Sequence, residues 1–180
     1  VKGDGLPPIV VVGNITVGGT GKTPLLLALI QYCQSRGLKV GVVSRGYGGS
    51  ISEPTVVTDR HSAADVGDEP MMLYKKTAVP VAICAKRQRA VDLLSQSQAL
   101  DVIFSDDGLQ HYAMPRSMEL VVIDAKRGVG NGHQLPVGPL RERLERIALA
   151  NAVVMNGGST ATKASRLTPV LAGASVPVHH

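Results

Sequence analysis

IVVVGNITVGGTGKTPLLLALI, residues 9–30, is the stretch that decides the fold. A short apolar run, a glycine-rich segment and a second apolar run with helical spacing follow one another, and this order predicts a strand, a loop and a helix. Consecutive backbone N–H groups of a glycine-rich loop can surround an anion when a helix begins directly after it. The stretch therefore predicts a loop that binds polyphosphate. The alternative is a glycine-rich turn that merely joins a strand to a helix.

The end of this loop follows the spacing G-x-x-x-x-G-K-[ST], but its start departs from it. Gly21, Lys22 and Thr23 fill the last three positions, whereas Thr16 stands in place of the first glycine. In loops of this kind the lysine supplies charge to the β and γ phosphates and the hydroxyl faces Mg²⁺. Pro24 suits the first turn of the following helix, where no backbone N–H is needed. The pattern thus favours phosphate binding.

Composition narrows the classes of function. The 180 residues suffice for one domain with a substantial core, and 44% of them are hydrophobic but only 3% aromatic, so we expect an aliphatic core. Few aromatic rings leave little for base stacking, and no nucleic-acid partner is expected. The net charge of +5 instead favours anionic partners, namely nucleotide phosphates, a phosphorylated substrate or an acidic membrane surface.

Membrane-spanning and disulfide-rich classes find no support in the sequence. No run of about 18 apolar residues occurs, so we expect no transmembrane segment. Cys33 and Cys84 lack the spacing of a zinc site or a disulfide framework, which makes a reducing cytoplasm the natural compartment. The start at Val1 and the abrupt end at His179 and His180 suggest a piece of a longer protein. We interpret this histidine pair as a flexible end or tag remnant rather than a metal site.

Short apolar runs alternate with helical or loop segments along the chain, which is the pattern of a parallel α/β sheet. The fold class expected is therefore α/β, a P-loop NTPase-like three-layer fold with a mostly parallel sheet. The predicted strands are 9–12, 40–43, 79–83, 102–104, 120–123 and 152–155. The predicted helices are 22–35, 69–76, 88–95 and 140–150, the first ending at a cation followed by glycine.

Polar clusters directly follow several of these apolar runs, and ligands of open α/β sheets gather at the carboxyl ends of strands. Asp106 and Asp107 follow the run 102–104, an arrangement that resembles a Walker B segment delivering a carboxylate to Mg²⁺. Because successive strand side chains point in opposite directions, we expect one of the pair to face the metal and the other a neighbouring group. The alternative is an ordinary Asp-Asp-Gly turn.

Other polar residues have two interpretations each. Asp68 either caps the predicted helix 69–76 or receives the proton of an attacking hydroxyl in phosphoryl transfer, and spacing alone favours the cap. His111 reads as a packed or hydrogen-bonded histidine when taken by itself. Arg141 and Glu142 read, from the charge pattern, as surface residues of the amphipathic helix 140–150.

An ordered set of motifs, taken together, resembles the tetraacyldisaccharide 4'-kinase family, the lipid A kinases of Gram-negative bacteria. Several of them are far more specific than the phosphate loop alone, and they span the chain from Ile9 to Gly158. The motifs are VGNITVGGTGKTP (12–24), SRGYGG (44–49), VGDEP (66–70), DDGLQHY (106–112), GNG (130–132), LPVGPLRE (135–142) and VVMNGG (153–158).

The resemblance implies a reaction and a location. The expected activity transfers the γ-phosphate of ATP to the 4'-hydroxyl of a tetraacylated glucosamine disaccharide 1-phosphate. The expected partners are this lipid A precursor and the cytoplasmic face of the inner membrane, which the enzyme would meet peripherally, with no obligate protein partner. A P-loop kinase domain is expected over 1–158 and a truncated or poorly ordered segment over 159–180.

The resemblance also assigns roles to residues. The implied catalytic residues are Asp68 as general base, with Lys22, Asp107 and His111. The implied ATP site is Thr16, Val17, Gly18, Gly19, Thr20, Gly21, Lys22 and Thr23, since the family's loop tends to carry Ser or Thr in place of the first glycine. Thr23, Asp106 and Glu142 are expected to face Mg²⁺. Gln110, with Arg87 or Arg89, is expected to meet the substrate or the transferring phosphate, and the two arginines are not distinguished.

The sequence departs from the family's pattern at both ends. The family has an N-terminal hydrophobic helix, whereas nothing like it precedes Lys2, and its sequence continues beyond the Asn-Gly-Gly segment with a histidine thought to support the base. Two competing hypotheses therefore stand beside the kinase. One is a nucleotide-switch ATPase of the partitioning or maturation type, although its signature lysine is absent near Thr16 and Val17. The other is an ATP-binding fragment without catalysis.

Overall fold

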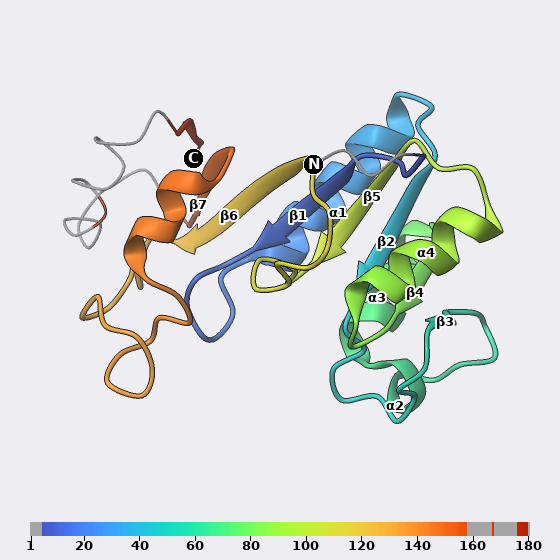
Figure 1. Ribbon diagram of the computed structural model, residues 1–180, viewed down its shortest axis with the longest axis horizontal. Helices are drawn as coiled ribbons and strands as arrows, with labels where there is room; N and C mark the ends of the chain where they lie inside the picture. Colours follow the sequence, from blue (N-terminus) through green and yellow to red (C-terminus); the bar gives the residue numbers. More distant parts are fainter. Residues whose placement is uncertain (1–4, 158–166, 168–175, 180) are drawn as a thin grey trace. The chain divides into compact units, whose positions relative to one another are not determined.

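The apolar runs of the sequence form the strands of the fold (Figure 1). The computed structural model describes residues 5–157, 167 and 176–179. β2 (Val40–Ser44) and β5 (Val102–Asp106) are buried at every position, as expected where helices cover both faces of a parallel sheet. The other strands are β1 (Ile9–Gly13), β3 (Thr55–Val56), β4 (Val81–Ile83), β6 (Met118–Asp124), β7 (Ala152–Asn156) and β8 (Val178–His179).

The described residues fall into two compact units. The first comprises those of 1–11 and 23–117, and the second comprises those of 12–22 and 118–180. The strand order is β3-β4-β2-β5-β1 in the first unit and β6-β7-β8 in the second. β2 runs parallel to β4 and β5, and β7 runs parallel to β6 and β8, whereas β3 is antiparallel to β4. The predicted α/β class with a mostly parallel sheet is confirmed.

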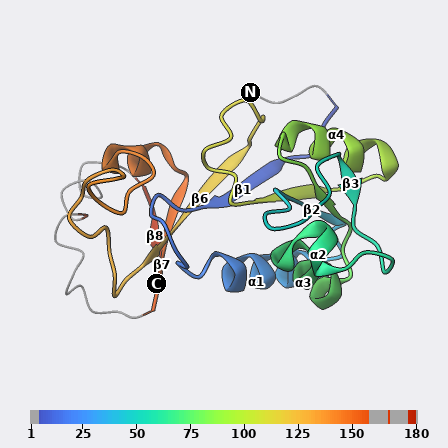
Figure 2. The same cartoon turned by 90° about the horizontal axis from the view of Figure 1, so that it is seen from below.

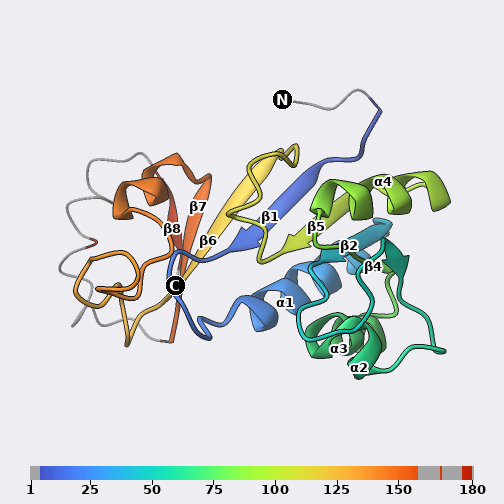
Figure 3. The same cartoon turned by 60° about the horizontal axis from the view of Figure 1, so that its bottom comes forward.

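Four helices belong to the first unit and complete its layers. They are α1 (Lys22–Ser35), α2 (Ala63–Val66), α3 (Asp68–Thr77) and α4 (Arg87–Ser97). The first residue of α1, Lys22, is assigned to the second unit. α1 and α3 lie on one side of β5, β2 and β4, and α4 lies on the other (Figures 2 and 3). This helix-sheet-helix stacking is the three-layer arrangement that the apolar strands predict.

α1 has the bounds predicted from the sequence. Leu26 and Ile30, one turn apart on the same face of the helix, are fully buried. Two residues after the end of the helix, Gly37 has a left-handed φ of 75°, and its N–H donates to the Gln34 carbonyl. The N–H of Leu38 then donates to the Cys33 carbonyl, so a glycine-terminated C-cap closes the helix as predicted.

The predicted α-helix over 140–150 is wrong. Only Leu144–Leu149 is helical, as the 3-10 helix η1, and Arg143 before it is extended. The N–H of Leu140 donates to the His133 carbonyl and the N–H of Arg141 donates to the Ile15 carbonyl. Because these donors are used in contacts with distant segments, the chain stays extended where the apolar spacing indicated a helix.

Three short elements have no counterpart in the sequence prediction, namely α2, β3 and β8. Each has four residues or fewer, too short for a periodic signal. The predicted domain boundary at 158 lies outside the described residues, and the predicted segment 159–180 is described only at 167 and 176–179. The division into a domain over 1–158 and a truncated or poorly ordered segment over 159–180 therefore stays a prediction. None of the described helices is long and apolar enough to cross a membrane.

The loop after β2 packs its backbone against α2 and against Gly67, which joins α2 to α3. The N–H groups of Ser50 and Ile51 donate to the carbonyls of Ala64 and Asp65. A Cβ added to Gly49 would come within 2.5 Å of the Asp65 carbonyl oxygen. A Cβ added to Gly67 would come within 2.6 Å of the Tyr47 carbonyl oxygen. Glycine thus permits the contact that fixes where α3 begins.

Replacing Gly67 with alanine should destabilise the protein more than the same change at Gly48. Both residues have positive φ, 95° and 81°, but only Gly67 faces backbone atoms, since nothing lies within 4 Å of a Cβ at Gly48. We expect Gly48→Ala to lower the free energy of unfolding by about 1–2 kcal/mol and Gly67→Ala by about 2–4 kcal/mol. Urea denaturation measures both, and equal losses would show that the backbone contact contributes nothing.

Candidate active site

The phosphate loop is organised by Asn14, a buried residue directly after β1. Its side-chain amide donates to the Thr16 carbonyl at 2.7 Å, and its Oδ1 accepts a hydrogen bond from the Lys22 Nζ at 3.1 Å. Lys22 opens α1 and therefore reaches back over the loop to the strand end. The sequence prediction missed Asn14. The sequence feature that could have indicated Asn14 is its position, as a polar residue between a buried strand and a glycine-rich loop.

The start of the loop is tied to a distant segment of the same unit. Thr16 is buried and forms an antiparallel bridge with Leu140, and the Val17 N–H donates to the Pro139 carbonyl at 2.9 Å. Extended backbone suits a β-branched residue, which explains why threonine stands in place of the first glycine. Gly18 and Gly21, by contrast, have φ of 91° and 86° and need to be glycine.

Thr23 and Asp68 belong to the first unit, where Thr23 contacts the start of α3. The Thr23 hydroxyl donates to the Glu69 carboxylate at 3.1 Å. Asp68 is the first residue of α3, but the N-cap is Gly67 and no side chain caps the helix, so the capping interpretation of Asp68 is wrong. The Asp68 carboxylate is exposed and accepts no hydrogen bond from the residues that the structure describes.

Asp106 and Arg87 form a buried polar pair at the end of β5. The Asp106 carboxylate accepts a hydrogen bond from the Ser44 hydroxyl at 3.3 Å. Arg87 is only 2% exposed, and its guanidinium donates to the backbone carbonyls of Cys84 and Asp106, both at 3.1 Å. Burial lowers the pKa of Arg87 to about 10, a shift that Asp106 and Asp107 oppose. Arg87 therefore stays protonated at neutral pH.

Asp107 does not continue the strand. β5 ends at Asp106, and Asp107 has a left-handed φ of 48°, a conformation that Asp tolerates better than most residues. The expectation that the two carboxylates point in opposite directions assumed that both residues lie in one strand. Because the strand ends at Asp106, that argument no longer applies. The change of direction after Asp106 instead leads the chain into the loop that carries Gln110 and His111.

One pocket collects four of the predicted site residues. It has a volume of about 570 Å³. Arg87 and Arg89 come from the first turn of α4, and Gln110 and His111 come from the loop after β5. Arg89 is exposed and pairs with Glu53 at 3.0 Å. The lining residues are Ala85, Lys86, Arg87, Gln88, Arg89, Gln110, His111, Tyr112, Ala113 and Met114.

His111 is half-buried, and its surroundings disfavour a charged ring. Burial lowers its pKa below the usual 6.5, and the neighbouring charges of Arg87 and Arg45 lower it further, while Asp107 opposes the shift. The imidazole is therefore neutral at pH 7. A neutral ring can accept or donate a hydrogen bond at the pocket without adding a third positive charge beside the arginines.

Glu142 lies in the second unit, inside a network of charged side chains. Its carboxylate lies 3.5 Å from the Arg146 Nε, and Arg146 also donates to both carboxylate oxygens of Glu119, at 2.6 and 2.8 Å. The Glu142 side chain is only 12% exposed, so the interpretation of Glu142 as a surface helix residue is wrong. Its expected role at Mg²⁺ stays a prediction.

The predicted Mg²⁺ ligands are therefore distributed over both units, Thr23 and Asp106 in the first and Glu142 in the second. Among the described residues, no three or more His, Cys, Asp or Glu side chains gather as a metal cluster. Mg²⁺ does not require one, because it is usually held by one or two carboxylates together with substrate phosphates and water. The hydroxyl and carboxylate oxygens of Thr23 and Asp106 are donors of the kind that Mg²⁺ prefers.

Comparisons with known proteins identify relatives. The sequence profile of the tetraacyldisaccharide-1-P 4'-kinase family matches residues 5–179. The tetraacyldisaccharide 4'-kinase of Azotobacter vinelandii is 58% identical over 153 residues, and that of Stutzerimonas stutzeri is 56% identical over 158 residues. These alignments cover 84% and 86% of this chain but 46% and 47% of the relatives. The chain thus spans about half the length of the curated relatives it matches.

Solved structures agree with this result. The crystal structure of LpxK from Aquifex aeolicus in complex with ATP matches with a TM-score of 0.78 at 26% identity, covering 96% of this chain and 53% of that one. A GDP complex of the signal recognition particle receptor FtsY from Elizabethkingia anophelis has a TM-score of 0.60 at 17% identity over 96% of this chain and 56% of its own, a likeness of fold alone. With the profile match over nearly its whole length, the chain belongs to the tetraacyldisaccharide-1-P 4'-kinase family.

Proposed function

We propose that the protein containing this chain is a kinase that transfers the γ-phosphate of ATP to the 4'-hydroxyl of a tetraacylated glucosamine disaccharide 1-phosphate. Family membership and one structural observation support the proposal. The observation is the Asp68 carboxylate, which stands exposed at the start of α3 and is not used to cap it. A general base needs lone pairs that other donors do not occupy, and Asp68 meets that requirement.

In the proposed reaction the 4'-oxygen attacks the γ-phosphorus. A new O–P bond forms, the bond between the γ-phosphorus and the β–γ bridging oxygen breaks, and ADP leaves with that electron pair. Asp68 takes the proton of the 4'-hydroxyl. Phosphoryl transfer depends mainly on positioning and on compensating the phosphate charge, and a single well-placed carboxylate and a few cations can supply both.

The ATP half of the reaction is assigned to the phosphate loop. Lys22 already has its ammonium held over the loop by Asn14, so it is placed to shift toward the β and γ phosphates with little reorganisation. Backbone N–H groups of residues 18–21, together with Lys22, would share the remaining phosphate oxygens. Val17 is the exception among the predicted binding residues, since its N–H donates to Pro139.

Mg²⁺ is the cation that this chemistry implies. Bound beside the phosphates, it would neutralise part of their negative charge. Thr23 and Asp106 are the proposed ligands, with Glu142 as a further carboxylate. The role of this chain's residues is to present oxygen donors. Ser44 orients the Asp106 carboxylate and Glu69 accepts the hydrogen bond of the Thr23 hydroxyl.

The acceptor half is assigned to the pocket at the start of α4. The disaccharide carries a 1-phosphate, and the pocket offers the buried cation of Arg87 and the exposed cation of Arg89. Gln110 and the neutral ring of His111 add hydrogen-bonding groups that suit sugar hydroxyls. Two backbone carbonyls anchor Arg87, so we assign it to binding the substrate from a fixed position. Arg89 must first break its ion pair with Glu53, so we assign it to binding with a side chain that moves.

The proposed site of action is the cytoplasmic face of the inner membrane. Four acyl chains keep the acceptor in the bilayer, so the enzyme must work at its surface as a peripheral protein. A net charge of +5 favours approach to an anionic leaflet. Neither a nucleic acid nor an obligate protein partner has a role in this proposal.

The direct test is a kinase assay of the complete polypeptide that contains this chain, with radiolabelled ATP, Mg²⁺ and the lipid disaccharide 1-phosphate. We expect label on the lipid. ATP hydrolysis stimulated by a protein partner, with no labelled lipid, would favour the nucleotide-switch ATPase instead. ATP binding without turnover of any acceptor would leave the non-catalytic hypothesis standing.

Asp68→Asn should lower kcat of the complete polypeptide by roughly 10²- to 10⁴-fold, because the amide cannot take the proton of the 4'-hydroxyl. The affinity for ATP should stay within about twofold of the wild type. Asp59→Asn serves as the matched control, because it removes an exposed carboxylate of the same unit whose one partner among the described residues is the Tyr74 hydroxyl. Full turnover in Asp68→Asn would remove Asp68 from the role of base.

Lys22→Met should weaken ATP binding to the 180-residue chain by roughly ten- to a hundredfold, since it deletes a charge-assisted contact to phosphate. Titration with a fluorescent ATP analogue measures the affinity. Lys76→Met, in the last turn of α3, removes an equal charge from an exposed position and should leave binding unchanged. Equal affinities in the wild type and Lys22→Met would contradict the assignment of the loop to ATP.

A further inference from the structure

The carbonyl oxygens of the phosphate loop accept hydrogen bonds from three side chains outside the sequence-predicted site. The Asn14 amide donates to the carbonyls of Thr16, at 2.7 Å, and Gly18, at 3.5 Å. The Arg127 guanidinium donates to Val17 through Nη2 and to Gly19 through Nη1, both at 3.3 Å. The Asn156 amide donates to Thr20 at 3.2 Å. Every carbonyl from Thr16 to Thr20 therefore has a side-chain donor.

Two of these donors come from neighbouring strand ends. Asn156 is the last residue of β7, where it pairs in register with Asp124, the last residue of β6. The Asp124 carboxylate accepts the N–H groups of Lys126 and Arg127, at 2.8 and 3.0 Å, and so fixes the turn that carries Arg127. The Ala125 N–H donates to the Asn156 carbonyl at 2.8 Å and joins the two anchors.

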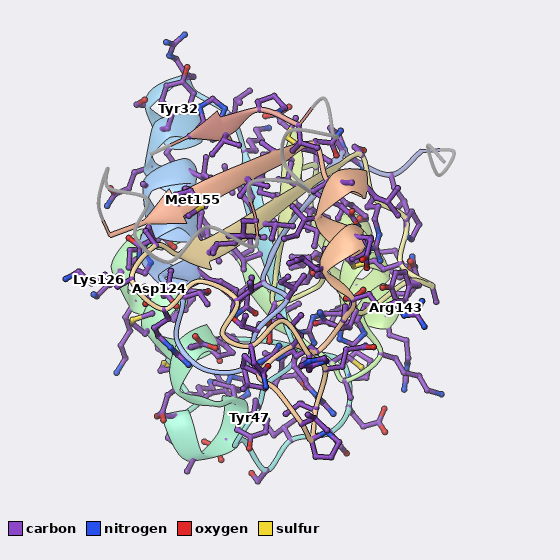
Figure 4. The ribbon with its side chains drawn as sticks, turned by 90° about the vertical axis from the view of Figure 1, so that its left-hand side faces the viewer. Tyr32, Tyr47, Asp124, Lys126, Arg143 and Met155 are labelled. Carbon is purple, nitrogen blue, oxygen red and sulfur yellow. The ribbon has the colours of Figure 1, made fainter. Side chains whose placement is uncertain are left out.

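Close packing supports a specific fit between these side chains and the loop glycines. A Cβ added to Gly18 would come within 2.8 Å of the Arg127 Nη1, and one added to Gly21 would come within 2.0 Å of the Asn156 Nδ2. Gly18 and Gly21 also have positive φ. Figure 4 shows the neighbouring Lys126 projecting outward from the same turn, beside Asp124.

We propose that Arg127 and Asn156 are positioning residues that hold the loop carbonyls away from the bound polyphosphate, so that the N–H groups face it. This inference rests on the proposed function, because it takes ATP as the ligand of the loop. A carbonyl oxygen turned toward a phosphate would repel it. The rotation that turns a carbonyl toward the phosphate also turns the N–H of the same peptide group away from it. Arg127 acts through its planar fork, which reaches two carbonyls at once.

The test measures the Kd of the 180-residue chain for ATP and for inorganic tripolyphosphate. Arg127→Met and Arg127→Lys should both weaken the two ligands about tenfold, because lysine keeps the charge but cannot bridge Val17 and Gly19. Asn156→Asp, which is isosteric but lacks the donor, should weaken them to a similar degree. Lys126→Met removes a charge from the same turn and should leave both affinities unchanged.

The outcomes separate the possible roles. Wild-type affinity in Arg127→Lys together with weaker binding in Arg127→Met would mean that Arg127 contributes charge only. That result would contradict the positioning role. Wild-type affinity in Asn156→Asp would exclude Asn156 from the positioning role.

Amide hydrogen exchange is the second measurement. Arg127 and Asn156 are exposed, so their variants leave the core intact, and we expect faster exchange in residues 16–21 of each variant. Unchanged exchange would overturn the proposal. Absence of ATP binding by the wild-type chain would contradict the proposed function itself.

Discussion

Every peptide group carries a donor and an acceptor that point in opposite directions, and this constraint shapes the second unit. A loop that offers N–H groups to phosphate must place its carbonyls against other donors. Here the donors are Asn14 directly after β1, Arg127 in the turn after β6 and Asn156 at the end of β7. The segment around Leu140 adds backbone pairs to the start of the loop. Several segments of the second unit thus hold this one loop in place through hydrogen bonds.

A second constraint, close approach of backbone to backbone, shapes the first unit. The loop after β2 reaches the start of α3 only because Gly49 and Gly67 lack side chains. That contact fixes the first turn of α3, and it therefore fixes the position from which the Asp68 side chain projects. The absence of a side-chain cap is consistent with this arrangement, because backbone packing has already fixed the helix start. The carboxylate is left available for chemistry.

The sequence predicted the repeating elements well and the irregular ones poorly. Apolar runs located six strands, and α1 has its predicted bounds, because burial on both faces and helical spacing leave a periodic signal. The region 140–150 failed because its N–H donors serve His133 and Ile15, a long-range contact that spacing cannot reveal. Resemblance brought Arg87, Arg89, Gln110 and His111 to attention, and they line one pocket. It assigned no role to Arg127 or to Asn156, although Asn156 lies in the motif 153–158, because their roles depend on which carbonyls they meet.

Arg87 and His111, two of the titratable groups of the pocket, differ in charge at neutral pH although the same physical cause shifts both pKa values. Burial disfavours the charged form of both Arg87 and His111, so both pKa values fall. The pKa of Arg87 falls to about 10, so the guanidinium stays charged at neutral pH, whereas the pKa of His111 falls below its usual 6.5, so the imidazole is neutral. At neutral pH the arginine therefore carries its charge and the imidazole adds none. The anion binding that we propose for this pocket should therefore change little with pH near neutrality. Acidification would charge His111 beside Arg87 and Arg45, at the cost of repulsion between three cations.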